Sequence, residues 1–248
     1  MKTNLLRRYP SALLLALGVS TFCHAQTAAG PMSRLTIIHV KPDMVNEWRE
    51  LEKSYVPDLK KGGQKSRTVY QTYIFGNSYE YVIVAPINNF ADFDGQSPVA
   101  KALEPATLLR RNTMLVKCIE SSTSFMSTRQ LDISNLILND AIPPILVSVR
   151  YRITPGKMQE FINLMKSDIL PVYKKAGVRM IVALRSVGTN PNDVTVGIYY
   201  KSFADYGGQP FLTKQLGAEA AAKINAKFFG VRTVIEVVTR RRVDELSF

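Results

Sequence analysis

The sequence predicts an α+β fold in which two tandem β-α-β-β-α-β repeats pack sheet to sheet and close a barrel within one chain. Two observations predict it: the 248-residue chain matches itself at an offset of 113 positions, and both copies show the same order of strand-like and helix-like segments. A third observation concerns stability. Only one cysteine, Cys118, follows the first 25 residues, so no disulfide can form within that part and packing must hold the core.

The offset is clearest where FADFDGQ at 90–96 aligns with FADYGGQ at 203–209, with five of seven residues identical. Identical pairs also occur upstream and downstream of this segment. They are Pro42 and Pro155, Glu47 and Glu160, Leu51 and Leu164, Lys53 and Lys166, Lys101 and Lys214, and Arg129 and Arg242. The second half is therefore predicted to be a diverged copy of the first.

The N-terminus has the pattern of a secretory signal peptide over 1–25. Lys2, Arg7 and Arg8 precede an apolar run at 12–19, and small residues ending at Ala25 precede the expected cleavage site. The run is too short to span a bilayer, which disfavours the alternative of a membrane anchor. We expect a periplasmic or secreted protein with a short leader at 26–33. Its formal charge after cleavage is 29 − 20 = +9.

The first copy is expected over 34–129 and the second over 145–244, with a linker at 130–144 that contains Pro143 and Pro144. In chain order, the first copy predicts a strand at 34–40, a helix at 44–59, strands at 67–75 and 79–87, a helical region from Asn89 and a strand at 121–129. The second copy predicts a strand at 145–153, a helix at 157–174, strands at 179–187 and 194–201, a helical region from Ser202 and a strand at 233–242.

Helix boundaries are indicated by local residue types. Apolar residues recur every three or four positions in each first helix, and Trp48 and its counterpart Phe161 occupy core-facing positions. Gly63 and Gly177 are expected to end these helices, while Asn89 and Ser202 fit N-cap positions with an acid three residues later.

This element order is that of the ferredoxin-like unit, an antiparallel sheet with both helices on one face. The other face of each sheet must also be covered. Fusion of two copies provides that cover, because the two bare faces can close on each other.

A run in the second copy resembles the NIPSNAP family. It comprises ITPGKMQEF at 153–161, LPVYKKAG at 170–177 and YYKSF at 199–203; the first copy is similar but has Pro42-Asp43-Met44 in place of Pro-Gly-Lys. The resemblance implies membership of the dimeric α/β-barrel superfamily, which includes cofactor-free antibiotic-biosynthesis-type monooxygenases and haem-handling enzymes. It implies no catalytic residues.

The residue inventory excludes several kinds of site. His39 is the only histidine after the signal sequence, which excludes centres built from two or more imidazoles and disfavours Ser-His-Asp catalysis. No phosphate-binding glycine loop or nucleophile elbow is present. We predict no bound cofactor, no metal site, no nucleic-acid partner and no transmembrane segment.

Strand alternation predicts which side chains face the space between the sheets. In the second copy Arg150 and Arg152 lie opposite the apolar set of Val149, Tyr151 and Ile153, and in the first copy His39 shares a face with Leu35 and Ile37.

We expect His39, Arg150, Arg152, Arg185 and Tyr199 to bind an anionic or enol-like small molecule. The alternative is that these arginines pair with acids of the other copy or lie at a solvated rim. Thr239 to Arg242 are interpreted as solvated protection of an edge strand, and Cys118 as a core residue.

Three functions follow from these predictions. The first is an exported small-molecule-binding barrel, with weak cofactor-independent oxygenase-type activity, whose interior holds a pocket of several hundred cubic ångströms. The second is a non-catalytic interaction protein, assembled into homo-oligomers, whose interior is filled. The third is a haem-handling protein with His39 as axial ligand.

Overall fold

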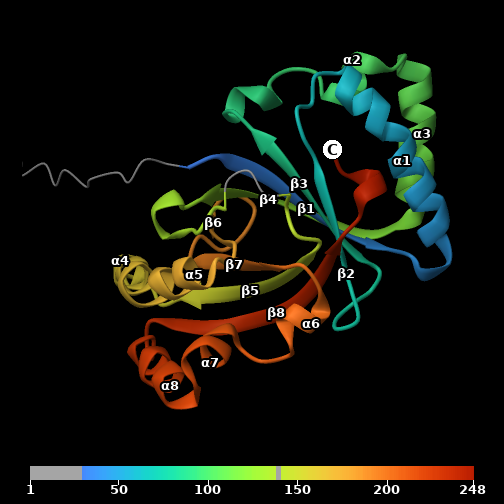
Figure 1. The fold of residues 1–248 in the computed structure, drawn as a ribbon. Helices are drawn as coiled ribbons and strands as arrows, with labels where there is room; N and C mark the ends of the chain where they lie inside the picture. Colours follow the sequence, from blue (N-terminus) through green and yellow to red (C-terminus); the bar gives the residue numbers. More distant parts are fainter. Residues whose placement is uncertain (1–29, 138–140) are drawn as a thin grey trace, which may run out of the picture.

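The computed structural model describes residues 30–137 and 141–248. The predicted signal peptide at 1–25 lies outside these residues. Within them, eight strands form one closed antiparallel barrel in the order β1-β3-β2-β8-β5-β7-β6-β4. The helices form two groups on opposite sides of the barrel (Figure 1). This architecture confirms the predicted fold of two tandem ferredoxin-like units that pack sheet to sheet.

The first half contains β1 (Met32–Val40), α1 (Val45–Lys61), β2 (Thr68–Thr72), β3 (Glu80–Ile87), α2 (Pro98–Ala102), α3 (Pro105–Cys118) and β4 (Ile119–Arg129). The second half contains β5 (Ile145–Ile153), α4 (Met158–Leu164), α5 (Leu170–Ala176), β6 (Met180–Arg185), β7 (Asp193–Tyr200), α6 (Phe203–Tyr206), α7 (Phe211–Leu216), α8 (Ala218–Lys227) and β8 (Arg232–Arg242).

The helix boundaries follow the predicted residue types. The side chain of Asn89 accepts a hydrogen bond from the Ala91 N–H, and that of Ser202 accepts one from the Asp205 N–H, so both are N-caps. Gly177 ends α5 in the left-handed conformation, with φ 62°. Trp48 and Phe161 are fully buried, each with 0% exposed surface, as their spacing predicted.

The helix predicted over 157–174 is present but is not continuous. A π-helical turn, Met165–Ile169, separates α4 from α5. Pro171 is the second residue after this turn and has no N–H to donate, which disturbs the hydrogen-bond ladder upstream. A proline alone does not cause the break, because Pro57 lies inside the uninterrupted helix α1.

Two seams join the halves into a barrel. Strand β4 pairs with β6 and places Ser127 opposite Arg185, and β2 pairs with β8 and places Thr72 opposite Arg240. The 113-residue offset relates these pairs, because Thr72 corresponds to Arg185 and Ser127 to Arg240. The interpretation of the segment 239–242 as a solvated edge is therefore wrong: β8 pairs with β5 on one side and with β2 on the other, and Arg240 is only 6% exposed.

Short segments after β4 and β8 cross to the opposite half. The 3-10 turn Leu131–Ile133 follows β4 and places Ile133 in the core of the second half, beside Phe161 and Met180. The 3-10 turn Asp244–Leu246 follows β8 and places Leu246 in the core of the first half, with Trp48. We call these segments the exchanged tails.

The backbone of each exchanged tail is tied to its host half in an equivalent way. Arg67 and Phe248 exchange two backbone hydrogen bonds of 2.8 Å, and the corresponding residues Met180 and Asn135 exchange two of 3.0 and 2.8 Å. The first tail occupies part of the expected linker at 130–144, which is therefore not irregular throughout.

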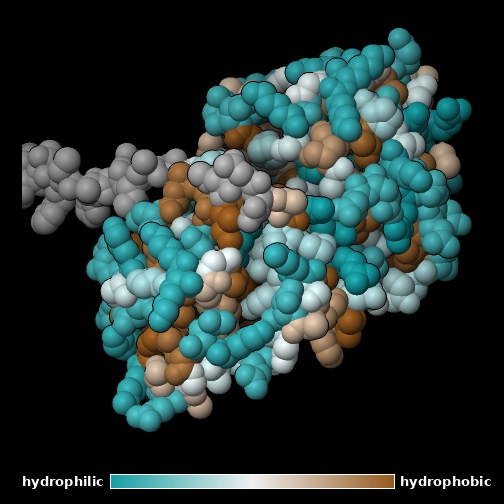
Figure 2. Space-filling view, in the orientation of Figure 1, coloured by the Kyte–Doolittle hydropathy of each residue, from teal (hydrophilic) through white to brown (hydrophobic). Residues whose placement is uncertain are grey.

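The face of the molecule in Figure 2 is mostly hydrophilic, and its hydrophobic residues form separate groups. No helix within the described residues is long and apolar enough to cross a bilayer.

Candidate functional site

The predicted strand faces are confirmed. Leu35 and Ile37 of β1 and Ser148 of β5 line the interior of the barrel, whereas Val149 and Tyr151 face the helices. The interior is partly filled and holds a cavity of about 130 Å³. This is larger than a packed core would leave, but smaller than the several hundred cubic ångströms expected for a binding barrel.

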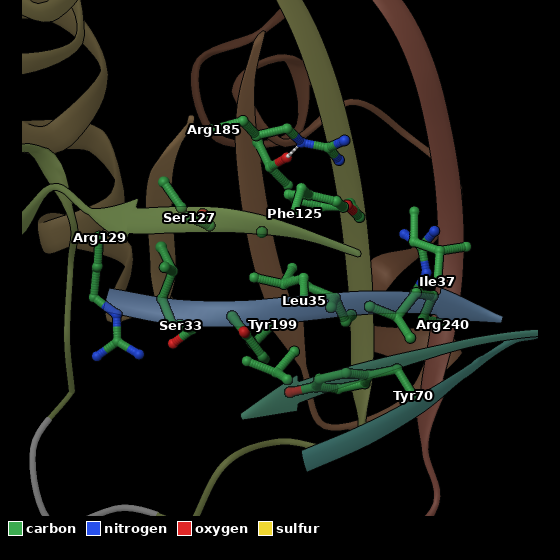
Figure 3. A pocket seen from close by; sticks show the side chains of 18 of the residues that line it. Ser33, Leu35, Ile37, Tyr70, Phe125, Ser127, Arg129, Arg185, Tyr199 and Arg240 are labelled. Carbon is green, nitrogen blue, oxygen red and sulfur yellow. Dashed lines mark hydrogen bonds between the residues drawn. The ribbon is translucent and has the colours of Figure 1, made fainter. Parts of the chain in front are cut away.

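The barrel cavity is lined by side chains from all eight strands (Figure 3). Its polar lining residues are Ser33, Tyr70, Ser127, Arg129, Ser148, Arg185, Thr195, Tyr199 and Arg240, and its apolar ones include Leu35, Ile37, Val82, Val84, Phe125, Leu146 and Ile181.

Arg185 reaches into this cavity from the end of β6. Its Nε–H donates a 2.9 Å hydrogen bond to Thr195 Oγ1, drawn as the dashed line in Figure 3, and its guanidinium lies over the Phe125 ring at 4.3 Å. No carboxylate of the described residues lies within ion-pair distance of Arg185. Burial, with a further contribution from Arg150, lowers the pKa of Arg185 to about 10. At neutral pH Arg185 is therefore a half-buried cation without an ionic partner among the described residues.

Tyr199 lines the cavity together with Tyr70. Burial raises the pKa of both tyrosines. Both hydroxyls are neutral at physiological pH and act as donors and acceptors, not as bases.

Arg150 and Arg152 lie on the inward strand face but beyond the cavity, where Asp193 binds both. Arg150 Nη1 is 3.4 Å from Asp193 Oδ2, and Arg152 forms an ion pair with the same carboxylate through Nε. Arg150 Nε also lies 3.6 Å from Glu236 Oε2. The arginines do pair with acids, as the alternative interpretation held, but both acids belong to the same half.

His39 is placed apart from the cavity at the end of β1. Its Nδ1 lies 2.8 Å from Ser121 Oγ and its Nε2 lies 3.3 Å from Glu80 Oε2. The Glu80 carboxylate also accepts hydrogen bonds of 2.7 Å from Thr72 and from Arg240 of the other half. Burial raises the pKa of Glu80, but these partners outweigh it, with Arg240 the strongest, and the net pKa is lowered.

The five predicted site residues are thus divided. Arg185 and Tyr199 share the cavity, Arg150 and Arg152 share Asp193, and His39 is bound to Glu80. The sequence analysis missed Glu80 and Asp193. The 113-residue offset relates them, and an acidic residue at the same position of both copies could have indicated that they pair with basic residues.

A second cavity, of about 340 Å³, lies between the sheet of the second half and its helices. We call it the sheet–helix cavity. Aromatic and aliphatic side chains dominate its lining: Val147, Val149, Tyr151, Met165, Ile169, Tyr173, Met180, Val196, Ile198, Tyr200, Tyr206, Pro210, Phe211, Leu212, Val234 and Val237, with Asn225 and Arg232 as polar members. Met165 and Ile169 belong to the π-helical turn, a distortion often found at functional sites.

Arg232 is the one arginine of the sheet–helix cavity among the described residues. Its guanidinium is held between two rings, 4.2 Å from the centre of Tyr151 and 3.8 Å from that of Phe228, and Nη2 lies 3.5 Å from Asn225 Oδ1. No described carboxylate forms an ion pair with it. Burial lowers the pKa of Arg232, which still leaves it a cation at neutral pH.

Three tyrosines of this cavity, Tyr151, Tyr173 and Tyr200, remain protonated at neutral pH. Burial raises the pKa of Tyr151, raises that of Tyr173 well above its usual value, and raises that of Tyr200 to about 12. The cavity therefore offers one cation and neutral hydroxyls in aromatic surroundings.

The first half has a cavity in the corresponding position, of about 310 Å³, but with a different electrostatic character. Its lining includes Glu52 and Arg67, which form a buried ion pair with side chains 6% and 4% exposed. That arginine is already neutralised by a carboxylate of the protein. Arg232, by contrast, replaces the apolar Ile119 of the first copy at the equivalent strand position.

Comparison with known proteins supports the fold. No family model and no curated protein matches the chain, so the NIPSNAP resemblance stays a prediction. Among solved structures, an anthrone oxidase-like protein matches with a TM-score of 0.59 and 12% identity over 88% of this chain and 93% of its own. A protein of Lactobacillus acidophilus NCFM, provisionally assigned as a monooxygenase, matches with a TM-score of 0.56 and 11% identity over 86% of this chain and 94% of its own.

A mutant chlorite dismutase of Candidatus Nitrospira defluvii matches with a TM-score of 0.55 and 8% identity over 89% of this chain and 95% of its own. At these identities the similarity establishes the shared dimeric α/β-barrel architecture and no shared activity.

Proposed function

We propose that the protein binds a planar aromatic molecule, as an enolate, phenolate or carboxylate, in the sheet–helix cavity of the second half. The observation that carries this proposal is Arg232: a half-buried guanidinium, held between two aromatic rings, in a cavity of about 340 Å³ with no carboxylate partner among the described residues.

The chemistry of the cavity matches such a ligand. Its volume is at the lower end of the range of about 300–1,000 Å³ that small-molecule sites occupy. A buried charge is costly unless it is paired, and an anionic ligand supplies the missing partner. The rings of Tyr151 and Phe211 offer stacking surfaces, and the hydroxyl of Tyr200, whose pKa burial raises to about 12, offers a hydrogen-bond donor.

Oxygenase-type activity without a cofactor is the extension of this proposal. The anion of an electron-rich phenol or enol can itself react with O2, so the protein has to favour the anion and exclude water. Arg232 performs the first task and the apolar lining the second. The names of two structural neighbours, an anthrone oxidase-like protein and a provisional monooxygenase, support the choice. For anthrone the balance is one O2 consumed, a CH2 group oxidised to C=O and one water released.

Calorimetry with 2-naphthoate and O2 uptake with anthrone test the proposal. We expect Arg232→Gln to weaken 2-naphthoate binding by about tenfold or more, because it removes a charge-assisted interaction, and to slow O2 uptake. Arg241→Gln is the matched control, with the same loss of charge at an exposed position of the same strand. Equal affinities in the Arg232→Gln and Arg241→Gln variants would exclude this cavity as the site.

Haem handling finds less support. His39 lines neither cavity, and both of its ring nitrogens face partners. The described lining of the sheet–helix cavity includes no histidine or cysteine that could serve as an axial ligand. The residues therefore do not fit haem in the way that His39 suggested.

We further propose that the protein is exported. The support is the sequence alone, with its basic start, apolar run and small residues before Gln26. Intact-mass measurement of protein isolated from its own host tests this. We expect a chain that begins near Gln26, and a full-length cytoplasmic chain would contradict export.

A further inference from the structure

We propose that the barrel interior is a second binding site, independent of the sheet–helix cavity, and that it holds a short-chain monocarboxylate. The carboxylate lies on Arg185 and the alkyl group lies on the apolar wall of the barrel cavity.

The first argument is charge. Three arginines line the cavity, Arg129, Arg185 and Arg240, and no acidic side chain of the described residues lines it. Asp193 is shared by two arginines and Glu80 is bound to Arg240, so no acid remains for Arg185. An enclosed site with surplus positive charge is stabilised by an anion.

The second argument is the geometry of Arg185. Its Nε is occupied by Thr195 and one face of its guanidinium by Phe125, which fixes the plane of the group. The terminal amino groups of this guanidinium have no acceptor among the described residues. Two parallel N–H groups held in this way match the two oxygens of a carboxylate. Figure 3 shows Arg185 extended over the cavity, with Arg129 and Arg240 at opposite ends of the group of side chains.

The third argument comes from the repeat. The residues of the first copy that correspond to Arg150, Arg185 and Arg240 are Ile37, Thr72 and Ser127. Each seam sets an arginine of the second half beside a hydroxyl of the first: Arg185 opposite Ser127 and Arg240 opposite Thr72. The strand positions that carry these arginines in the second half are thus filled by uncharged residues in the first half. The fold does not require arginines there, which indicates a role in binding.

The size and lining of the cavity restrict the ligand. A cavity of about 130 Å³ is close to the roughly 150 Å³ that accommodates benzene, so about five or six non-hydrogen atoms fit. Leu35, Val82, Val84 and Ile181 form an apolar wall, and Ser148 and Tyr199 add hydroxyls. An acid of the size of acetate or propionate satisfies both the cation and the apolar wall.

Isothermal titration calorimetry with propionate, at constant ionic strength set with chloride, tests this inference. We expect saturable binding to the wild-type protein and at least tenfold weaker binding to Arg185→Gln. Arg110→Gln, the same change at an exposed residue of α3, serves as the control and should bind like the wild type. Absence of saturable binding to the wild type, or unchanged binding by Arg185→Gln, would overturn the inference.

A second variant keeps the test decisive if Arg185→Gln does not fold. Ala183 lines the cavity, and Ala183→Val reduces its volume while Arg185 remains. We expect Ala183→Val to retain native circular dichroism and to lose propionate binding, and full affinity in this variant would place propionate elsewhere. Arg232→Gln should bind propionate normally, which separates this inference from the function proposed for the sheet–helix cavity.

Discussion

Ile133 and Leu246 lie 113 positions apart, and each is fully buried, with 0% exposed surface, in the core of the opposite half of the chain. Ile133 follows β4 of the first half and packs in the second. Leu246 follows β8 of the second half and packs in the first. The halves are therefore joined by side-chain packing as well as by the two strand seams.

Replacing either residue with alanine should destabilise the whole protein. We expect Leu246→Ala and Ile133→Ala each to lower the free energy of unfolding by about 2–5 kcal/mol, the usual range for removing a large aliphatic side chain from a packed core. Urea denaturation followed by circular dichroism measures this. Leu109→Ala is the control, because Leu109 is 70% exposed and its loss should change stability little. Similar midpoints for all three variants would contradict the role of the exchanged tails.

Asp193 should prove essential to the second half, because its carboxylate is 1% exposed and neutralises both Arg150 and Arg152. We expect Asp193→Asn to lower the free energy of unfolding by about 1–3 kcal/mol, because it removes a buried acceptor from two half-exposed arginines. A double-mutant cycle with Arg152→Leu, measured by urea denaturation, isolates the coupling between the pair. A coupling energy near zero would show that the interaction contributes no stability.

Glu80 should make stability depend on acid pH. Its pKa is lowered in the folded state, so its contribution is full above the unfolded value of about 4.3 and is lost as the pH falls through the lower folded value. We expect Glu80→Gln to be less stable than the wild type at pH 7, with a difference that shrinks below about pH 4. Thermal unfolding across this range measures it. Glu219→Gln, at a side chain 85% exposed, should show no such difference.

Tyr200 should make stability depend on alkaline pH. Burial raises its pKa to about 12, so its contribution is full below the unfolded value and declines as the pH rises towards the folded one. That window runs from about pH 10 upward. We expect Tyr200→Phe to remove one tyrosine that ionises only at high pH. An absorbance titration at about 295 nm, where tyrosinate absorbs, measures this. A titration curve identical to that of the wild type would assign the raised pKa to another residue.

The sequence predicted those features that local periodicity or the repeat determines. The inward position of Ser148 and the outward position of Tyr151 follow from alternation, and the burial of Trp48 and Phe161 follows from helical spacing. The pairing of β2 with β8 has no local signal in the sequence, because the residues that pair, such as Thr72 and Arg240, lie far apart along the chain. For that reason Arg240 was interpreted as an exposed edge residue.

The sheet–helix cavity was missed for a different reason. Arg232 stands at the first position of β8, where the pattern predicts only a strand, and its buried surroundings come from Tyr151 and Phe228 of other elements. A comparison of the two copies would have found it, because the equivalent residue Ile119 is apolar. The π-helical turn was not predictable from periodicity, since Met165 and Ile169 keep the apolar spacing of an ordinary helix.

The position of Leu246 also constrains the order in which the chain can fold during synthesis. The core around Trp48 lacks one of its fully buried members until Leu246 has emerged from the ribosome. The first half is made early but completed late, whereas the second half receives Ile133 before its own strands are made. Nascent chains arrested before Leu246 should therefore leave the N-terminal half open to proteases, although every strand of its own is already present.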